Sequence, residues 1–548
     1  MSILEEKLIK SITDVIIKKY NIETPDGLVM LELPKDKSHG QFTTNIAMRI
    51  SKLVSKNPRD IASEIKDDIL NSVSDLEKIE VAGPGFINFF IKSDSFSDII
   101  NTILDDGDNF GKNNVGNGKK VLIEYVSANP TGSLHLGHAR GAVWGDCCAR
   151  LMNASGFDCL REYYINDAGN QINNLAISID ARYKELFGMP LNIPEGGYHA
   201  EDIIEIAKLI KSQDGDKWLN ADEDEKLSYF REFGMKVELE NIKKDLKLYR
   251  CEFDSWISEK SLYEKGLIEK SLDEMKNKGL IYEEDGALWF RSTKYGDDKD
   301  RVLKKSDGSY TYFTPDIANH LYKIERGYNK LIDLWGADHA GYIDRMKNAL
   351  YALGYEKDTL EVDIIQMVRL VENGIEVKMS KRSGKSYTIR DLCEEVGVDT
   401  ARYFFIDKAL DNQMDFDLGL ARLKTNENPV FYIQYAYVRL HSIMNKIDNI
   451  KKLDKYNLLI DDQEVTILRQ LSLFPKVVGE AAEKRSPNKL CNYIYQLAKL
   501  INSYYVSCSI LNAETEELKQ ERLALIKATS IVLKNAFNLI GIEALEKM

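Results

Sequence analysis

The residues with the clearest chemistry in this chain are two histidines three positions apart, His135 and His138, in the sequence HLGH. They follow an apolar run at 121–126 and a turn at 127–132, and a helical pattern continues from Ala139. A strand, a sharp turn and a helix N-terminus form an anion site, because unpaired backbone N–H groups and the helix dipole point at the ligand. The spacing predicts a phosphate site in which both imidazoles donate hydrogen bonds to phosphate oxygens as charge accumulates on them.

The glycine between the histidines supports this prediction. Gly137 allows a ligand to approach the backbone closely, because a Cβ at this position would obstruct it. The alternative for the two histidines is structural, namely a helix N-cap and a core residue, and for a single histidine that interpretation is the stronger one. A zinc site is a further alternative, but the chain offers no matching third ligand nearby. The complete HxGH string favours the phosphate site, because composition alone rarely produces it.

A second chemical group is the lysine pair Lys378 and Lys381, in the sequence KMSKR. Two ammonium groups on a mobile loop can close over a triphosphate and balance the charge on a departing pyrophosphate. Ser380 lies between them, and Gly384 shortly after gives flexibility. A lysine pair is normally a solvated surface, and here the distant HxGH string favours the catalytic interpretation.

Two further segments fit the remaining parts of a nucleotide. Gly336 and Asp338 follow a strand-like run, and an acid at the carboxyl end of a strand is the usual place to hold a ribose hydroxyl. Met367, in the sequence QMV at 366–368, ends the next strand-like run and is predicted to bracket an adenine ring. A strand edge in the core explains the QMV segment equally well.

The elements that must position these residues alternate between strands and helices from about 119 to 400. This alternation predicts a parallel sheet with helices on both faces. The segment from about 175 to 290 is charged and helical in pattern, and we expect it to be an insertion that lacks the β-rich character of an editing domain. The candidate strands of the sheet are 121–126, 159–165, 331–337 and 362–368.

The two flanking regions have different patterns. Residues 1–95 combine helical and strand-like runs, which predicts a small α+β domain. The glycine- and asparagine-rich segment 111–120 marks a boundary. From 428 to 548 the pattern is almost entirely helical. The fold class is therefore multidomain α/β, with a Rossmann-type catalytic domain at 119–400 between an α+β domain and an all-α domain.

Composition limits the class of protein. A chain of 548 residues with 44% hydrophobic and 29% charged residues predicts about three or four globular domains. No apolar run approaches the ~20 residues of a membrane helix, and the N-terminus predicts an amphipathic helix rather than a signal peptide. Seven scattered cysteines without a CxxC pair argue against disulfides and structural zinc. We expect a cytoplasmic protein without a metal site or a membrane contact.

The net charge of −13 does not by itself suggest nucleic-acid binding, because neutralisation of phosphates requires Lys and Arg. Local patches decide that question, and 74 Lys and Arg residues leave room for them. A prediction of RNA binding must therefore rest on the sequence motifs.

Six longer runs resemble the bacterial arginyl-tRNA synthetases, and the resemblance covers essentially the whole chain. HLGH and KMSKR alone are typical of all class I aminoacyl-tRNA synthetases, whereas the combination with the other runs is specific for the arginyl enzymes. The runs are VSANPTGSLHLGHARGAVWGD, REYYINDAGNQINNL, GDDKDRVLKKSDGSYTYFTPDIA, WGADHAGYIDRMK, VKMSKRSG and ENPVFYIQYAYVRL.

The resemblance implies roles for the three domains and for the nucleotide contacts. The C-terminal helical domain would bind the anticodon, and the N-terminal domain would contact the tRNA elbow. His135, His138, Lys378 and Lys381 would be catalytic. The residues that would contact ATP are Gly137, Gly336, Asp338, Met367 and Ser380.

It also implies an arginine pocket. Tyr312 and Asp316 match the guanidinium pocket of the family, with Glu124 as a second acid. The chemistry agrees, because a buried guanidinium needs a carboxylate and oriented acceptors, and residues four apart share a helix face. An ordinary helix cap is the alternative for Tyr312 and Asp316.

The opposite end of the amino acid is assigned to a second group. Ser127, Asn129 and His135 resemble positions that hold the amino and carboxylate groups of arginine. Asp167 and Gln171 would border the same pocket. One departure concerns the lysine loop: many arginyl enzymes lack its second lysine, which this chain keeps as Lys381, and Arg382 replaces the final serine of the class signature.

The implied reaction is an ATP-dependent ligation of L-arginine to arginine tRNA, through arginyl-adenylate, with Mg²⁺ carried by ATP. The family also implies that activation needs bound tRNA, and we expect a monomer. Two alternatives remain at this point. One is a class I synthetase for another amino acid or a related nucleotidyltransferase, and the other is a catalytically silent tRNA-binding paralogue.

Overall fold

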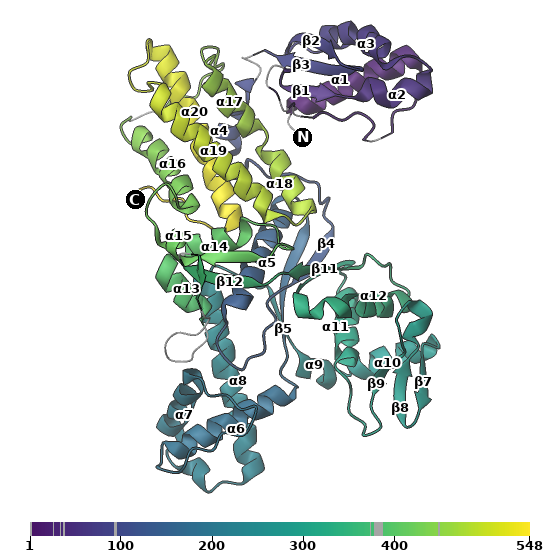
Figure 1. The fold of residues 1–548 in the computed structure, drawn as a ribbon, viewed down its shortest axis with the longest axis vertical. Helices are drawn as coiled ribbons and strands as arrows, with labels where there is room; N and C mark the ends of the chain where they lie inside the picture. The colour runs from purple at the N-terminus through teal and green to yellow at the C-terminus, as the bar shows by residue number, and fades with distance from the viewer. Residues whose placement is uncertain are drawn as a thin grey trace.

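The computed structural model describes residues 3–25, 27–32, 34, 36, 39–92, 96–372, 374–377, 387–447 and 450–548. Figure 1 shows a central sheet with lobes around it: the N-terminal domain at one end, the C-terminal helices beside it, and two lobes at the opposite end. The parallel-sheet core with an α+β domain and a helical domain confirms the predicted fold class.

The N-terminal domain packs three helices against a small antiparallel sheet, in the strand order β1-β3-β2. Its apolar residues face inward from both layers; Ile12, Ile61 and Phe89 are fully buried. It stands apart from the central sheet (Figure 1, purple). Its elements are α1 (Ile3–Tyr20), β1 (Phe42–Thr44), α2 (Ile46–Val54), α3 (Pro58–Ser72), β2 (Leu76–Ala82) and β3 (Phe86–Ile91).

The central sheet has five parallel strands in the order β11-β10-β4-β5-β6. Each of the four candidate strands from the sequence overlaps one of them. β5 and β6 lie on one side of β4, whereas β10 and β11 lie on the other, so the strand order reverses between β4 and β10. The carboxyl ends of these two parallel strands lie side by side at one edge of the sheet. The strands are β4 (Lys120–Glu124), β5 (Asp158–Ile165), β6 (Ser255–Ser258), β10 (Lys330–Gly336) and β11 (Leu360–Ile365).

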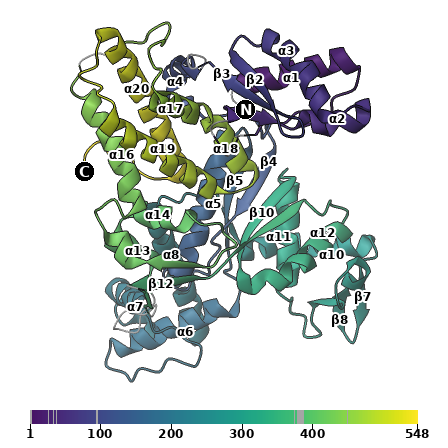
Figure 2. The ribbon, with the colours of Figure 1, turned by 45° about the horizontal axis from the view of Figure 1, so that its top comes forward.

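The helix α5 (Leu136–Ala154) is the central support of the molecule. Most of its residues are buried, and α18 and α20 of the C-terminal region pack on it (Figure 2). Gly145 allows α5 to pack closely against Tyr125, the residue after β4, because a Cβ at position 145 would collide with the ring of Tyr125. A helix held on all sides in this way keeps its N-terminus at a fixed place on the sheet edge.

The predicted insertion is helical only in its first part. Three long helices with a core of their own connect β5 to β6, and they form the lower lobe of Figure 1. The following chain returns to the central sheet as β6, since SWIS at 255–258 pairs with β5. The helical elements are α6 (Asn170–Glu185), α7 (Glu201–Asp214), η4 (Lys217–Leu219) and α8 (Glu223–Leu248).

The remainder of the predicted insertion forms a second lobe with an antiparallel sheet, β7-β8-β9. Asp285 and Gly286, both with positive φ, form the two-residue turn between β7 and β8. An Asp-Gly pair is a strong hairpin signal, because this turn requires left-handed backbone at both positions. The elements are α9 (Glu259–Glu264), α10 (Leu267–Asn277), β7 (Ile281–Glu284), β8 (Ala287–Phe290), η5 (Ser292–Tyr295), β9 (Arg301–Lys304) and α11 (Phe313–Glu325).

The predicted strand 362–368 divides into two. β11 ends at Ile365, and β12 begins a separate small sheet, β13-β12-β14, after a break at Gln366 and Met367. This region joins the central sheet to the C-terminal helices. Its elements are η6 (Ala337–Tyr342), α12 (Ile343–Ala352), β12 (Val368–Glu372), β13 (Ile375–Glu376), α13 (Ile389–Val396), α14 (Val398–Ile406), β14 (Met414–Asp417) and α15 (Leu418–Arg422).

The C-terminal region is a helical bundle (Figures 1 and 2). Two elements between the N-terminal domain and β4, α4 (Ile99–Asp106) and η3 (Gly107–Asn109), contact α20 of this bundle. Among the described helices, α20 is long and apolar enough to cross a membrane, although 72% of that window is buried inside the fold, as in a core helix. The bundle helices are α16 (Pro429–Met444), α17 (Asp462–Ser472), α18 (Phe474–Glu483), α19 (Pro487–Ser507) and α20 (Glu516–Ile540).

Candidate active site

The turn after β4 is a strained segment at the edge of the sheet. Val126 (φ 67°) and Ser127 (φ 39°) adopt left-handed backbone, which is costly for a β-branched residue such as valine. The Ser127 hydroxyl donates to Glu124 Oε1 (3.0 Å) and accepts the N–H of Tyr164 (3.1 Å). The hydroxyl of Tyr163 donates to the carbonyl of Ala128 (2.8 Å). These bonds to β4 and β5 hold the strained turn in one conformation.

The two histidines lie where this turn enters α5. The helix begins at Leu136, three residues before the expected Ala139, because His135 is its N-cap. Nδ1 of His135 accepts the N–H of Gly137 (3.1 Å), and Nδ1 of His138 accepts the N–H of His135 (3.3 Å). The ring centroids are 3.9 Å apart.

These bonds determine the tautomer of both rings. Because each Nδ1 accepts a backbone N–H, each neutral imidazole carries its proton on Nε2. Burial lowers the pKa of His138 to about 3, with a smaller contribution from His135, and burial also lowers the pKa of His135. Both rings are therefore neutral at pH 7, with Nε2–H available to donate. The N-cap alternative is correct for His135, but His138 is only half-buried and is not a core residue.

The chain that follows the predicted lysine loop attaches to the same turn. The N–H of Ile389 donates to the carbonyl of Leu134 (2.9 Å), and the N–H of Leu136 donates to the carbonyl of Tyr387 (3.1 Å). Lys378, Ser380 and Lys381 themselves lie outside the described residues. The described chain thus resumes beside HLGH at Tyr387.

The other residues assigned to the nucleotide lie at the same edge of the sheet. Gly336 ends β10, and a Cβ on it would meet the carboxylate of Asp338 in η6. The Asp338 side chain is exposed and lies 3.4 Å from His339. Met367, after β11, is 69% exposed. The structure therefore brings together the described members of the predicted nucleotide site, Gly137, Gly336, Asp338 and Met367.

The predicted guanidinium pocket includes a half-buried carboxylate of α11. Asp316 lies in the first turn of this helix, and the hydroxyl of Tyr342 donates to its Oδ2 (2.7 Å). Burial raises the pKa of Asp316, and the Tyr342 hydroxyl opposes that rise. Tyr312 is the N-cap residue one turn earlier and is 71% exposed. The two residues lie one turn apart at the start of α11, and their role as a guanidinium pocket stays a prediction.

Glu124, predicted as the second acid, is already paired. Its Oε2 lies 2.6 Å from Nζ of Lys323, which is fully buried and also contacts Asp333 (3.1 Å). His320 connects Asp333 to the main chain of the pocket, with Nε2 at 2.9 Å from Asp333 and Nδ1 at 2.7 Å from the carbonyl of Asp316. Burial raises the pKa of Glu124 although Lys323 opposes this, so the carboxylate depends on the lysine.

A further acid of the pocket, Glu259, was not identified from the sequence. It opens α9 directly after β6, is 6% exposed, and faces Asp316 and the hydroxyls of Tyr164 and Tyr263. It makes no ion pair with any described residue. Burial, followed by Asp316, raises its pKa to about 7. The sequence signal was an acid directly after a strand, as for Asp338, but β6 was not among the predicted strands.

The residues predicted around the amino end of arginine are also adjacent. Asn129 donates from Nδ2 to Oε1 of Gln171 at the start of α6. Asp167 is held by the Ser258 hydroxyl (2.6 Å) and the N–H of Lys260 (2.9 Å). Asp167 thus ties the β5 turn to the residues that flank Glu259.

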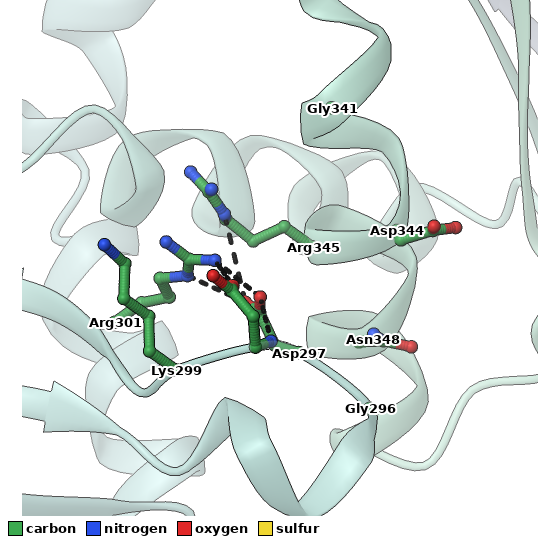
Figure 3. A pocket seen from close by; sticks show the side chains of 9 residues that line it. Gly296, Asp297, Lys299, Arg301, Gly341, Asp344, Arg345 and Asn348 are labelled. Atoms are coloured by element: carbon green, nitrogen blue, oxygen red, sulfur yellow. Dashed lines mark hydrogen bonds and ion pairs between the residues drawn. The ribbon is translucent and has the colours of Figure 1, made fainter.

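A charged cavity of about 390 Å³ lies behind this pocket and supports it. Arg301 forms two hydrogen bonds to Asp297, and Arg345 approaches the same carboxylate at 3.9 Å (Figure 3). The Arg345 guanidinium also lies 5.2 Å from the ring centroid of Tyr342. None of the predicted site residues lines this cavity, and of its two arginines Arg345 lies beside Tyr342, which donates to Asp316.

Metal and thiol chemistry leave little trace. In the described part of the chain no group of three or more His, Cys, Asp or Glu side chains could hold a metal ion. All seven cysteines are free thiols, six of them buried.

The comparison with known proteins agrees with this geometry. Three family models match in order: the arginyl tRNA synthetase N terminal domain at 6–91, the class I (R) tRNA synthetase catalytic domain at 99–418, and the DALR anticodon binding domain at 433–548. The chain belongs to the arginyl-tRNA synthetase family. The first of these ranges contains the N-terminal α+β unit, the second contains the central sheet and both lobes, and the third contains most of the helical bundle.

Relatives of this synthetase support the assignment over its whole length. It is 51% identical over 540 residues to arginine–tRNA ligase 1 of Halalkalibacterium halodurans, covering 97% of both chains. It is 51% identical over 525 residues to arginine–tRNA ligase of Bacillus subtilis, covering 95% of this chain and 94% of the other. The Thermus thermophilus arginyl-tRNA synthetase structure shares the fold, with a TM-score of 0.75, 21% identity and full coverage of both chains. Family membership removes the alternatives of another amino acid or a related nucleotidyltransferase.

Proposed function

We propose that the site at the edge of the central sheet joins L-arginine to the 3′-terminal adenosine of arginine tRNA at the expense of ATP. The carboxylate of arginine attacks the α-phosphorus of ATP, the bond to the β-phosphate oxygen breaks, and arginyl-adenylate and pyrophosphate form. The 2′-hydroxyl of the terminal adenosine then attacks the arginyl carbonyl, and AMP leaves. Both steps need positioning and charge stabilisation rather than a side-chain nucleophile.

The α-phosphate is proposed to bind at the N-terminus of α5. The Nε2–H groups of His135 and His138 donate to its oxygens. Neutral imidazoles are suitable donors because no positive charge on the ring has to be desolvated. Gly137 lets the phosphate approach the backbone N–H groups. Lys378 and Lys381, with Ser380, are proposed to balance the charge of the leaving pyrophosphate.

The guanidinium group of arginine is proposed to lie between Asp316 and Glu259. Glu259 is buried and Asp316 is half-buried, each acts on the other electrostatically, and neither forms an ion pair with a described residue, so a bound guanidinium would supply the missing positive charge. Glu124 contributes through Lys323 and Ser127 rather than as a free acid. Tyr312, exposed beside Asp316, closes the open side of the guanidinium.

The amino and carboxylate groups of arginine are proposed to be held by Ser127, Asn129, His135 and Gln171. The bond between Asn129 and Gln171 places two amide groups between HLGH and the acidic pocket. Because His135 borders both groups, it orients the attacking carboxylate toward the α-phosphate.

The remainder of ATP is proposed to bind along β10 and β11. Asp338 holds the ribose beyond Gly336, and Met367 brackets the adenine. Mg²⁺ arrives with the phosphates of ATP as part of the substrate, which fits a site whose described residues offer no metal-ligand cluster of their own.

The whole chain contributes to tRNA binding in this proposal. Residues 1–95 contact the tRNA elbow, 119–400 hold the acceptor end, and 428–548 bind the anticodon. We further propose a monomer in the cytoplasm without a membrane contact, consistent with the burial of α20.

The observation that carries the proposal is the pair of neighbouring carboxylates, the half-buried Asp316 and the buried Glu259, which have no ion-pair partner among the described residues. Charging of purified tRNA should be tested with arginine, lysine, glutamate and cysteine in parallel. We expect charging with arginine alone. Charging with another of these amino acids would overturn the pocket assignment, and tRNA binding without any charging would identify a catalytically silent paralogue.

A further inference from the structure

Arg140, two residues after HLGH, is a buried cation that the proposed mechanism does not use. Its side chain is completely buried at the fifth position of α5. Among the described residues it forms no ion pair, and its Nε has no hydrogen-bond partner. A buried guanidinium without a carboxylate is costly, and a cation near a helix N-terminus opposes the helix dipole. Such a residue requires a specific role.

The contacts of Arg140 are all main-chain carbonyls from two segments. Nη1 donates to the carbonyl of Gln366 (3.1 Å) and to that of Asn412 (2.8 Å), and Nη2 donates to that of Ala409 (2.7 Å). Gln366 lies in the break between β11 and β12, and the other two lie in the turn between α14 and β14. A guanidinium suits this task, because its planar fork of donors can bind several carbonyls at fixed angles.

Neighbouring contacts show that the two segments form one unit. The N–H of Gln366 donates to the carbonyl of Leu410 (3.2 Å), and the N–H of Met414 donates to the carbonyl of Met367 (3.3 Å). Gly141 lies directly against Ile365, since a Cβ on it would be 2.6 Å from Cδ1 of that residue. Arg140 thus connects the first turns of α5 to the main chain on both sides of Met367.

The free main-chain group of this unit is the N–H of Met367. It has no hydrogen-bond partner among the described residues, while the carbonyl of the same residue is occupied and its side chain is exposed. An N–H that solvent can reach is free to donate to an acceptor on a bound ligand in place of water. N1 of adenine is an acceptor, whereas N1 of hypoxanthine carries a proton and would repel a donor.

We propose that Arg140 is a positioning residue, which fixes the main-chain edge at Gln366 and Met367 relative to HLGH and thereby selects adenine over hypoxanthine. This inference rests on the proposed binding of adenine at Met367. It adds the residue that sets the distance between the base and the α-phosphate, because one side chain on the phosphate-binding helix holds the base-binding strand.

The variant Arg140→Lys tests the role, since it keeps the charge but loses the fork. Aminoacylation should be measured with complete tRNA and saturating arginine, with ATP and with ITP as alternative nucleotides. We expect the KM for ATP to rise about tenfold, corresponding to the loss of one or two charge-assisted hydrogen bonds, and the preference for ATP over ITP to fall by a similar factor. The KM for arginine should not change.

A matched control is Arg485→Lys. Arg485 also holds β11, through two bonds to Asp363 (2.6 and 2.9 Å), but it contacts carboxylate side chains of the strand and not the main chain at Gln366. The substitution Arg485→Lys should lower the stability of the fold without changing the preference for ATP over ITP. If Arg140→Lys retains the wild-type preference, or raises the KM values for ATP and arginine equally, Arg140 is only a structural residue and the inference fails.

The same assay with His138→Asn separates this inference from the proposed function. A loss of activity in His138→Asn with a normal ATP preference in Arg140→Lys would overturn only the role of Arg140. Unchanged activity in His138→Asn would overturn the proposed phosphate site, whatever Arg140→Lys does.

Discussion

The phosphate end and the arginine end of this site are built in different ways. The phosphate end is local: His135, Gly137 and His138 lie within four residues and are oriented by backbone bonds inside the same turn. The arginine end takes its acids from β4, α9 and α11, and Tyr342 from η6. One end depends on a single helix start, while the other depends on the packing of several elements.

Their electrostatics differ in the same way. The histidines are neutral, because burial lowers the pKa of both. The arginine end collects buried carboxylates, and Lys323 neutralises only Glu124 and Asp333. In the proposed function the remaining acids, Asp316 and Glu259, bind a cation in the ground state, whereas the imidazoles respond to charge that develops during the reaction. Substitutions at the arginine end should therefore change KM, and those at the phosphate end should change kcat.

The largest effect is expected for Asp316→Asn. Loss of one member of a buried charge pair costs about 3–5 kcal/mol, so kcat/KM for arginine should fall by two to three orders of magnitude or more. Steady-state aminoacylation at varied arginine concentration measures this. Asp358→Asn, on the exposed side of the sheet, is the control. An unchanged KM for arginine would remove Asp316 from the pocket.

His138→Asn tests the other side of the comparison. Removal of one donor to a developing oxyanion lowers kcat by about a hundredfold, and the KM for arginine should stay within about twofold. Single-turnover charging with saturating arginine and ATP measures the chemical step. His199→Asn, at an exposed position, should have no effect. A selective rise in the KM for arginine would show that the two ends do not divide their tasks.

A smaller effect is expected from pH at the arginine end. The pKa of Glu259 is raised to about 7 by burial and by Asp316, so below pH 7 the acid is protonated and must lose its proton when a guanidinium binds. The KM for arginine should therefore rise about fivefold from pH 7 to pH 6, and it should level off above pH 8.

Glu259→Gln provides the control for this pH dependence. The variant should bind arginine more weakly at pH 8 and show a KM that is nearly independent of pH between 6 and 8. A wild-type pH profile in the variant would assign the titration to another group.

The smallest effect is expected for Tyr342→Phe. The hydroxyl supports Asp316 with one hydrogen bond, so its loss should raise the KM for arginine about three- to tenfold and leave the KM for ATP unchanged. Tyr351→Phe, on the same helical region but partly exposed, is a suitable control. Equal changes in both KM values would mean that Tyr342 supports the whole site rather than Asp316.

The sequence allowed the strand, the turn and the helix around HLGH to be predicted almost completely, and the binding of phosphate there stays a prediction. The apolar run of β4, the turn and the HLGH string are adjacent in the chain, so their spacing contained the geometry. The start of α5 was placed three residues late, because a histidine is an unusual N-cap. The Asp285-Gly286 turn was a local signal as well, and it indicates the hairpin that replaces the last part of the predicted helical insertion.

The arginine end could be predicted only in part. Asp316 and Tyr312 were identified through their spacing and the family resemblance. The pairing of Glu124 with Lys323 and the position of Glu259 depend on which elements pack together, and these residues are far apart in sequence. The sequence shows that a residue is Asp or Glu, but it does not show whether a lysine or a substrate neutralises the carboxylate.

By itself the sequence determined the order of elements, the parallel sheet and the phosphate-binding helix start, because strand and helix periodicity and a four-residue signature are properties of neighbouring residues. Only the tertiary structure decided which buried acids are already paired and which remain for arginine, and how Arg140 joins the phosphate helix to Met367. Those properties depend on distances between segments that fold together from different parts of the chain, and on the burial that makes an unpaired charge costly.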